Sequence, residues 1–177
     1  MADIKIALLG NPNSGKTSLF NALTGSRQHV GNWPGKTVER KKGNLRYRGK
    51  DIEVTDLPGT YSLTALSEEE VIARDFILFE KPDIVVAVVD ASNLERNLYL
   101  VVQVLELQVS LILGLNMSDR AKSLDYEIEQ CGLSRRLGDI PVVLTNARRQ
   151  EGLDALQDVI INLADITTPS TPKKVHT

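Results

Sequence analysis

Apolar residues recur along the chain in short runs that are typical of buried strands. Strands of a parallel sheet are covered on both faces and are therefore apolar along most of their length. A further segment, 44–59, resembles two strands joined at Gly49-Lys50 and predicts a hairpin within residues 38–57. The four nearly continuous apolar runs cover residues 4–10, 83–91, 110–116 and 140–146.

Between these runs lie segments whose apolar residues follow helical spacing. Two of them open with a serine three residues before a glutamate, Ser67 with Glu70 and Ser92 with Glu95, which is the pattern of a helix N-terminal capping box. Gly25 can end the first of the helices. The predicted helices cover residues 17–25, 67–80, 92–107 and 152–165.

The alternation of strands and helices predicts an α/β fold. We expect a mostly parallel six-stranded sheet with one antiparallel strand, which the hairpin supplies, and helices on both faces. The length of 177 residues suits one domain. We assign residues 1–164 to it, because residues 165–177 lack periodicity and are rich in Thr, Pro and Lys, as a flexible tail or the start of a linker is.

Composition argues against several classes of protein: nucleic-acid-binding, disulfide-linked and membrane-spanning. The formal net charge is −2, which gives no electrostatic reason to expect nucleic-acid binding. The single cysteine, Cys131, excludes an internal disulfide and a cysteine metal cluster. No apolar run approaches the roughly 18 residues of a membrane helix, and the N-terminus lacks the pattern of a signal peptide. The cytoplasm is the compartment we expect.

Residues 10–17, GNPNSGKT, fit the phosphate-loop pattern G-x-x-x-x-G-K-[ST] between a predicted strand and a predicted helix. Gly10 and Gly15 permit backbone angles that let successive N–H groups turn toward phosphate oxygens. Lys16 would place its charge against the β- and γ-phosphates, and Thr17 would offer a hydroxyl to Mg²⁺. The candidate nucleotide-binding residues here are Gly10, Asn11, Pro12, Asn13, Ser14, Gly15, Lys16, Thr17 and Ser18.

The tetrapeptide DLPG, residues 56–59, ends the second strand of the hairpin. Asp56 could hold Mg²⁺ through a water molecule, as a Walker-B acid does. Gly59 would let a backbone N–H approach the γ-phosphate. Asp, Pro and Gly are also common turn residues, so a plain turn is the alternative.

Two further tetrapeptides follow strands and point to the base. In NMSD, residues 116–119, the Asp119 carboxylate could accept hydrogen bonds from the N1–H and the amine of guanine, a donor pair that adenine lacks. Asn116 would tie the site to the phosphate loop, and Met117 adjoins it. In TNAR, residues 145–148, the Ala147 N–H could meet the guanine O6 oxygen. Ligands of open α/β sheets bind at the carboxyl ends of strands, which is where Asn116, Met117, Asp119, Thr145, Asn146 and Ala147 lie.

In this order, the motifs resemble those of the Ras-like GTPase G domain. The longer strings HVGNWPGKTVERKKG, DLPGTYSLTALSEEEVIARDFI and VVDASNLERNLYL are similar to the cytosolic G domain of the FeoB ferrous iron transport proteins. The resemblance covers residues 3–164. It implies a three-layer P-loop GTPase fold and hydrolysis of GTP by attack of water on the γ-phosphate, with GTP and GDP as ligands.

The resemblance also implies the metal ligands and the catalytic residues. Thr37, in a first switch segment at 26–40, would join Thr17 as a protein ligand of Mg²⁺, with Asp56 acting through water. In FeoB-like proteins an asparagine at the position of Asn13 helps bind K⁺ beside the phosphates, with backbone carbonyls of the switch. The potassium ligands here would be Asn13, Gly31 and Trp33, and the catalytic residues would be Lys16, Asn13, Thr37 and Gly59.

Four residues depart from the usual motifs. Met117 stands where a lysine normally packs against the purine, Asn146 where a serine is usual, and Lys36 where the FeoB family commonly has valine. Thr60 replaces the glutamine that orients water in Ras-like enzymes, so we expect slow intrinsic hydrolysis. Trp33 would be exposed in the switch, either over the nucleotide or against a partner.

The resemblance places the chain in a larger protein. FeoB-like proteins continue with a helical domain and a membrane domain, which would be the partners of this chain at the cytoplasmic face of a cell membrane. The chain itself would be soluble, and a homo-oligomer stays open. Two alternatives remain: a nucleotide-dependent switch with negligible turnover that docks a partner, and a soluble GTPase of another Ras-like family.

Overall fold

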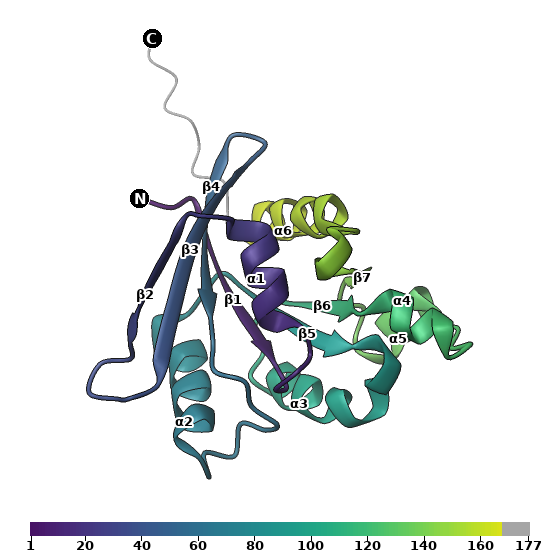
Figure 1. Ribbon diagram of the computed structural model, residues 1–177, viewed down its shortest axis with the longest axis horizontal. Coiled ribbons are helices and arrows are strands. Elements are labelled where there is room, and N and C mark those ends of the chain that lie inside the picture. Colours follow the sequence, from purple (N-terminus) through teal and green to yellow (C-terminus); the bar gives the residue numbers. More distant parts are fainter. Residues whose placement is uncertain (168–177) are drawn as a thin grey trace.

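Seven strands form one mixed sheet in the computed structural model, which describes residues 1–167. Their order is β2-β3-β4-β1-β5-β6-β7 (Figure 1). Only β3 runs opposite to the others, because it pairs antiparallel with both β2 and β4. The strands are β1 Ile4–Gly10, β2 Gln28–Asn32, β3 Glu39–Tyr47, β4 Lys50–Asp56, β5 Ile84–Asp90, β6 Leu111–Asn116 and β7 Val142–Leu144.

The α/β fold with one antiparallel strand is confirmed, but the predicted number of six strands is wrong. The additional strand is β2, which lies at the edge of the sheet beside β3. Its sequence, QHVGN, has no apolar alternation and its residues are largely exposed, so it buries little that a pattern could reveal. Backbone pairing with β3, from Gln28 opposite Gly43 to Asn32 opposite Glu39, defines it instead.

Helices cover both faces of the sheet. In Figure 1, α1 and α6 lie on one side, and α2 and α3 lie on the other. The short helices α4 and α5, which the sequence pattern does not delimit, fill the connection between β6 and β7. The helices are α1 Lys16–Thr24, α2 Glu68–Asp75 with a π-helical continuation Phe76–Glu80, α3 Leu94–Glu106, α4 Ser118–Ser123, α5 Gln130–Arg136 and α6 Leu153–Thr167; short 3-10 turns span Ala91–Asn93 and Ala147–Arg149.

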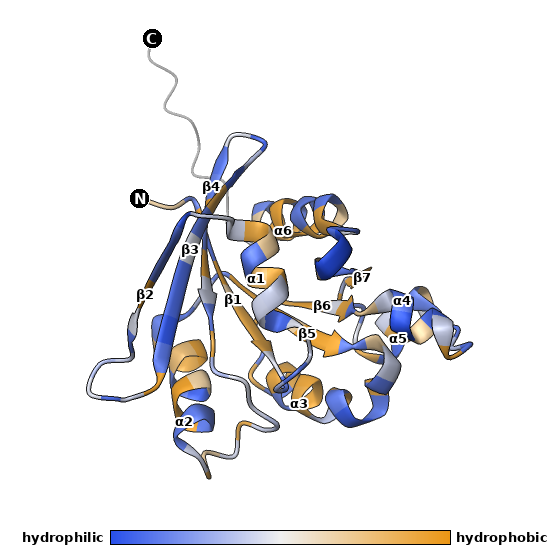
Figure 2. Ribbon diagram, viewed as in Figure 1, coloured by the Kyte–Doolittle hydropathy of each residue, from blue (hydrophilic) through white to orange (hydrophobic). Residues whose placement is uncertain are grey.

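Two hydrophobic clusters, one on each face, hold the layers together. Alternate residues of β1 serve the two sides: Ile6 and Leu8 join the cluster with α1 and α6, and Ala7 and Leu9 join the cluster with α2 and α3. Figure 2 shows the result as apolar colour along β1 and β5 and hydrophilic colour along β2 and β3. The central strands are therefore fixed by burial on both faces, while the β2–β3 edge has little apolar support.

The carboxyl ends of four parallel strands meet at one edge of the sheet. β1 ends at Gly10, β4 at Asp56, β5 at Asp90 and β6 at Asn116. The register supports this, since Leu8 lies opposite Asp56 and Asp90 lies opposite Asn116. Three of these ends open the predicted motifs, so the fold brings together segments that are far apart in the sequence.

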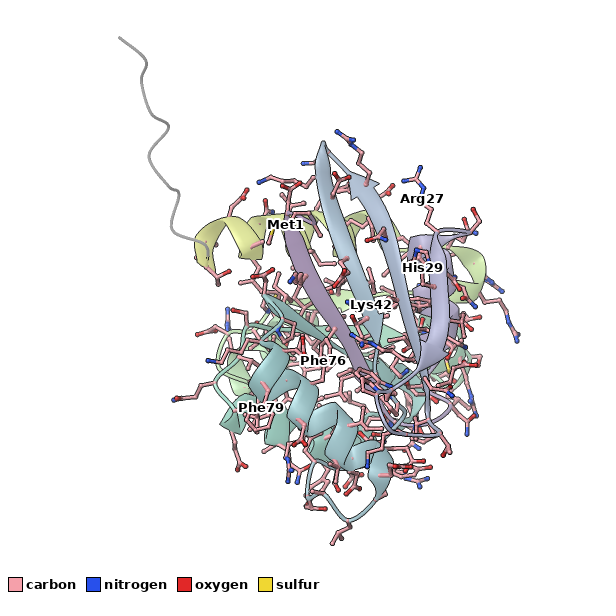
Figure 3. All side chains as sticks on the ribbon, turned by 90° about the vertical axis from the view of Figure 1, so that its left-hand side faces the viewer. Met1, Arg27, His29, Lys42, Phe76 and Phe79 are labelled. Atoms are coloured by element: carbon pink, nitrogen blue, oxygen red, sulfur yellow. The ribbon has the colours of Figure 1, made fainter. Side chains whose placement is uncertain are left out.

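The first switch segment contains a buried tryptophan, so the expectation that Trp33 is exposed is wrong. Its side chain is only 7% exposed. The ring meets Phe76 edge-on at 5.6 Å between centroids, and the Arg40 guanidinium lies 4.6 Å from its centre. Figure 3 shows Phe76 and Phe79 on the helical continuation of α2, residues Phe76–Glu80. Phe79 is 76% exposed. Trp33 packs inward because α2 and its continuation supply an apolar surface. The sequence around Trp33 gives no indication of this contact.

Residues 59–67, which the resemblance to G domains predicts to be a second switch segment, are held to α2 by one carboxylate. Glu70 accepts hydrogen bonds from the Ser62 hydroxyl at 2.7 Å, the Leu66 N–H at 3.0 Å and the Thr64 hydroxyl at 3.1 Å. Of the two predicted capping boxes, the one at Ser67 has its first bond, in which the Ser67 hydroxyl accepts from the Glu70 N–H at 3.2 Å. These bonds, the one from Ser62 foremost, hold the pKa of the Glu70 carboxyl below its ordinary value. The capping box predicted at Ser92 is wrong, because α3 begins at Leu94 after Asn93, which makes no side-chain cap bond.

The C-terminal end of the described chain is helical slightly beyond the predicted boundary. We expected a tail from residue 165, but α6 continues to Thr167. The rest of that predicted tail, 168–177, lies outside the described residues. No helix among the described residues has the length and apolar character needed to cross a membrane.

We expect the Glu70→Gln variant to loosen the second switch segment in a pH-dependent way. A carboxyl whose folded-state pKa is lowered stabilises the fold above its unfolded-state pKa of about 4.3, and this contribution disappears as the pH falls through the lower folded-state value. The difference between wild type and variant in amide hydrogen exchange at residues 62–66 should therefore be large at pH 7 and shrink below about pH 4.

Glu69→Gln is the matched control, because no described residue donates a hydrogen bond to the Glu69 carboxylate. Equal exchange in wild type and Glu70→Gln at pH 7 would contradict the role assigned to Glu70.

Candidate nucleotide-binding site

The phosphate loop follows β1 and leads into α1, as the sequence predicts. At Gly15 the backbone φ is +83°, and a Cβ atom there would collide with the Asn116 amide nitrogen. A Cβ atom at Gly10 would collide with the Val88 carbonyl oxygen of the neighbouring strand. Only glycine fits these two positions, the first because of backbone angle and space and the second because of space alone.

Lys16 and Asp56 meet at the base of the loop. The Lys16 ammonium donates to the Asp56 carboxylate, and both side chains are almost completely buried. Lys16 comes from the first turn of α1 and Asp56 from the end of β4, on the strand beside β1. The attraction between the two charges offsets much of the desolvation cost of burying them. Lys16 therefore stays charged at the base of the loop.

The Asn116 side chain joins the phosphate loop to the TNAR motif, residues 145–148. Its amide nitrogen donates to the Ser14 carbonyl at 3.1 Å. Its amide oxygen accepts from the Ala147 N–H at 3.1 Å and the Thr145 hydroxyl at 3.3 Å. Asn116 is 2% exposed. The expectation that Asn116 ties the site to the loop is confirmed at atomic level, and the partners at 145–147 extend it.

A cavity of about 260 Å³ lies between the ends of β6 and β7, where the sequence predicts the base. Asp119 lines it from α4 and has the Arg149 guanidinium 3.9 Å from its carboxylate. Asn146 is buried, and its side-chain oxygen accepts from the Arg149 N–H at 3.3 Å. The whole lining is Gly15, Ser18, Asn116, Met117, Asp119, Arg120, Asn146, Ala147 and Arg148.

A larger cleft of about 690 Å³ runs along the phosphate loop. Its lining includes Lys16, Thr17 and Gly59, and it meets the base cavity at Gly15 and Met117. The full lining is Asn11, Pro12, Asn13, Gly15, Lys16, Thr17, Ser18, Gly59, Met117 and Arg120. The two cavities share lining residues and so form one groove, which has at least one residue from every motif except the first switch.

The three predicted residues of the first switch lie away from this groove. Gly31 belongs to the edge strand β2, and Thr37 is exposed in the connection to β3. Trp33 lines a separate cavity of about 230 Å³ against α2. Asn13 lines the phosphate cleft. The structure thus places Asn13 and Thr17 at the candidate site and does not bring Gly31, Trp33 or Thr37 to them.

Thr60, at the position of the water-orienting glutamine, is turned into the protein. It is 2% exposed, and its N–H donates to the Gly10 carbonyl at 3.1 Å. Its hydroxyl has no hydrogen-bond partner among the described residues. In this arrangement Thr60 braces the second switch against β1 and does not face the cleft.

A third cavity of about 380 Å³ beside the loop is lined by several residues that the sequence motifs do not predict. Tyr61, Asp90, Arg96 and Arg120 line it with the loop residues Asn11–Ser14. Arg96 lies 5.0 Å above the Tyr61 ring. The only sequence signal was position, since Tyr61 directly follows DLPGT, Asp90 ends β5 and Arg120 directly follows NMSD.

The chain matches the family model described as ferrous iron transport protein B over residues 4–160. It is 52% identical over 161 residues to the Fe(2+) transporter FeoB of Escherichia coli K12, a match covering 89% of this chain and 21% of the relative. The corresponding transporter of Salmonella typhimurium is 51% identical with the same coverage. The chain therefore spans about a fifth of the length of these relatives.

Solved structures agree with the fold. The cytosolic domain of the T. maritima FeoB iron transporter in apo form has a TM-score of 0.89 and 48% identity, covering 92% of this chain and 64% of that one. The same domain is also known in a GDP form and a GMPPNP form. The FeoB G-domain from Methanococcus jannaschii has a TM-score of 0.82 and 46% identity, covering 93% and 99% of the two chains.

We expect Asn116→Ala to lower the free energy of unfolding by about 2 kcal/mol, because it leaves the buried Ala147 N–H without an acceptor and the Ser14 carbonyl without a donor. Urea unfolding of the two proteins would measure the difference. Asn44→Ala, at an exposed position on β3, is the control and should change stability little. An Asn116→Ala variant as stable as the control would show that this side chain does not brace the site.

Proposed function

The chain belongs to the ferrous iron transport protein B family, and we propose that it is the GTP-binding and GTP-hydrolysing domain of a ferrous iron transporter. The observation that carries the proposal is the groove in which Lys16, Asp119 and the phosphate loop converge, with Asn116 bonded to both of its sides. A phosphate loop alone would suit many nucleotides. The carboxylate at the far end of the same groove favours guanine.

The proposed reaction is hydrolysis of the terminal phosphate of GTP, in which positioning and charge stabilisation do most of the work. The loop N–H groups and Lys16 would hold the phosphates, and Lys16 would shift part of its contact from Asp56 to the ligand. Gly59 lines the cleft beside Pro12, so its N–H can approach the terminal phosphate. Asp119 would bind the base, and the Ala147 N–H would divide between Asn116 and the guanine O6 oxygen.

Two of the three predicted magnesium ligands lie where they could hold the ion. Thr17 lines the cleft, and Asp56 lies against Lys16 at its base. No group of three His, Cys, Asp or Glu side chains within residues 1–167 could hold a metal without other ligands, so phosphate oxygens would have to complete the coordination. Bound Mg²⁺ would neutralise charge on the β- and γ-phosphates. Thr37 could contribute only after the first switch moves toward the cleft.

Potassium is the second proposed cofactor. Asn13 is an exposed loop residue with φ of +66° and lines the phosphate cleft, so its side-chain oxygen is available to a cation there. Gly31 and Trp33 would join it only if β2 separates from β3 and Trp33 leaves Phe76. Bound K⁺ would supply positive charge beside the phosphates, in place of the charge or water-orienting side chain that Ras-like enzymes use.

One observation favours the second candidate, a nucleotide-dependent switch with negligible turnover. Thr60 faces the interior and donates its N–H to Gly10, so it cannot orient a water molecule in this conformation. Single-turnover hydrolysis of GTP separates the two functions: measurable GDP formation supports the GTPase, and bound GTP that persists supports the switch. If the chain is a GTPase, we expect its intrinsic turnover to be slow, because Thr60 stands where a glutamine would orient the water molecule.

The proposal also assigns a place in a larger protein. Because the chain spans 21% of its curated relatives, the remaining domains of such a transporter would be its partners. We propose that it works at the cytoplasmic face of a membrane, as the cytosolic-domain structures of its relatives suggest, and does not bind nucleic acid. A homo-oligomer remains open.

We expect the Asp119→Asn variant to shift nucleotide preference from GTP toward xanthosine triphosphate. An amide cannot accept both hydrogen bonds from the guanine N1–H and amine, whereas its NH₂ group can donate to the additional xanthine oxygen. Competitive binding of the two nucleotides would measure the shift. Asp125→Asn, an exposed aspartate beyond α4, is the control and should keep the GTP preference; an unchanged preference in Asp119→Asn would refute the base assignment.

We expect GTP turnover to be faster in KCl than in NaCl at equal ionic strength, and Asn13→Ala to remove most of that difference. The physical reason is that the larger cation needs the Asn13 oxygen to complete its ligands beside the phosphates. The measurement is phosphate release at matched nucleotide saturation. Equal rates of the wild-type protein in the two salts would eliminate the potassium proposal while leaving GTP hydrolysis intact.

A further inference from the structure

Arg120 lies where all three cavities of the site meet. It lines the phosphate cleft, the base cavity and the third cavity beside the loop. No other residue lines all three of these cavities. The cleft and the base cavity share Gly15, Ser18, Met117 and Arg120, so their junction corresponds to the point where the base and the phosphates of one nucleotide would be joined.

The backbone of α4 fixes the position of Arg120 relative to Met117. The Arg120 N–H donates to the Met117 carbonyl at 3.0 Å at the start of that helix. Met117 caps α4 and Arg120 lies in its first turn, and both side chains line the cleft and the base cavity. Met117, in the NMSD motif, occupies the position at which G domains usually have a lysine. Arg120 therefore restores a positive charge next to the place where the motif lacks one.

One anchored carboxylate faces the guanidinium. An Arg120 nitrogen lies 3.7 Å from Asp90 Oδ2. The other oxygen, Asp90 Oδ1, accepts from the Ser92 N–H at 2.8 Å and the Ser92 hydroxyl at 2.6 Å. The Asp90 side chain is 13% exposed, whereas that of Arg120 is 65% exposed. Asp90 is thus a rigid, nearly buried partner that limits the range of a largely exposed arginine.

The other arginine of the third cavity is differently engaged. Arg96 stacks 5.0 Å over the Tyr61 ring of the second switch, and it does not line the cleft or the base cavity. Among the arginines of these three cavities, Arg120 is the one that reaches both nucleotide-binding compartments; Arg148 lines the base cavity only. A surface ion pair with Asp90 would explain its charge but not its place at the junction.

We propose that Arg120 is a nucleotide-binding residue, whose guanidinium contacts the sugar and α-phosphate of the bound guanine nucleotide and replaces the cation missing at Met117. This inference rests on the proposed function. Asp90 acts as a positioning residue, which holds the guanidinium near the junction until the ligand arrives. The guanidinium can then donate to phosphate or sugar oxygens in a fixed fork geometry.

The position of the contact determines which properties depend on it. The α-phosphate and the sugar are common to GTP and GDP, so loss of Arg120 should weaken both ligands equally. Base selection belongs to Asp119, so the preference of the protein for GTP over ATP should not change. Because the contact is between charges at a largely exposed residue, its contribution should fall as salt rises.

Isothermal titration of the full chain with GDP and with GTP, in NaCl at low and high ionic strength, tests the proposal. We expect Arg120→Ala to weaken both ligands by about fivefold at low salt, a modest factor because the side chain is exposed. Arg120→Lys should recover part of the loss. Lys122→Ala removes the same charge two residues further along α4, outside the three cavities, and should leave affinity unchanged.

Several outcomes would overturn the inference. They are unchanged affinity in Arg120→Ala, an equal loss in Lys122→Ala, a loss confined to GTP, or no recovery in Arg120→Lys. Matching thermal unfolding of the variants would exclude a folding defect. Failure of the proposed function would look different, because the wild-type protein would then bind neither nucleotide.

The double variant Asp90→Asn, Arg120→Ala tests the role of Asp90. It should weaken binding no more than Arg120→Ala alone, since the two residues act through one contact. Additive losses would remove Asp90 from the proposal.

Discussion

The buried amide of Asn116 is the interaction on which the arrangement of the site depends. It bonds the phosphate loop at Ser14 and the TNAR motif at Thr145 and Ala147, so three strand ends keep a fixed separation. Gly15 must be glycine partly because this amide occupies the space of a side chain. The groove for base and phosphates is therefore built around a single polar side chain, which is buried at low cost because both of its ends are bonded.

The two switch segments are held by contacts of different kinds. The second is fixed by polar bonds, with Glu70 bonded to Ser62, Thr64 and Leu66 and Thr60 bonded to Gly10. The first is held by backbone pairing of β2 with β3 and by the packing of Trp33 on Phe76. For Gly31 or Thr37 to reach a nucleotide, the protein would have to give up pairing and packing, which a tightly bound ligand could offset.

Charges around the groove are already paired with one another. Lys16 contacts Asp56, Arg149 lies near Asp119, and Arg120 lies near Asp90. Each pair combines a residue that a nucleotide would bind with a partner from a neighbouring element. Such pairing keeps the ligand-binding charges oriented and compensated, and a nucleotide would exchange one set of charge contacts for another.

The sequence alone determined the order of the central elements and predicted the chemistry of the candidate site. Buried strands can be predicted from their apolar runs. The phosphate loop, DLPG, NMSD and TNAR are local motifs whose chemistry follows from residue type. Only the tertiary structure decided that QHVGN is a strand, that Trp33 is buried, that Thr60 faces inward and that Arg120 lies at the junction of three cavities. These facts depend on pairing and packing between segments far apart in the chain, which no local pattern of residues records.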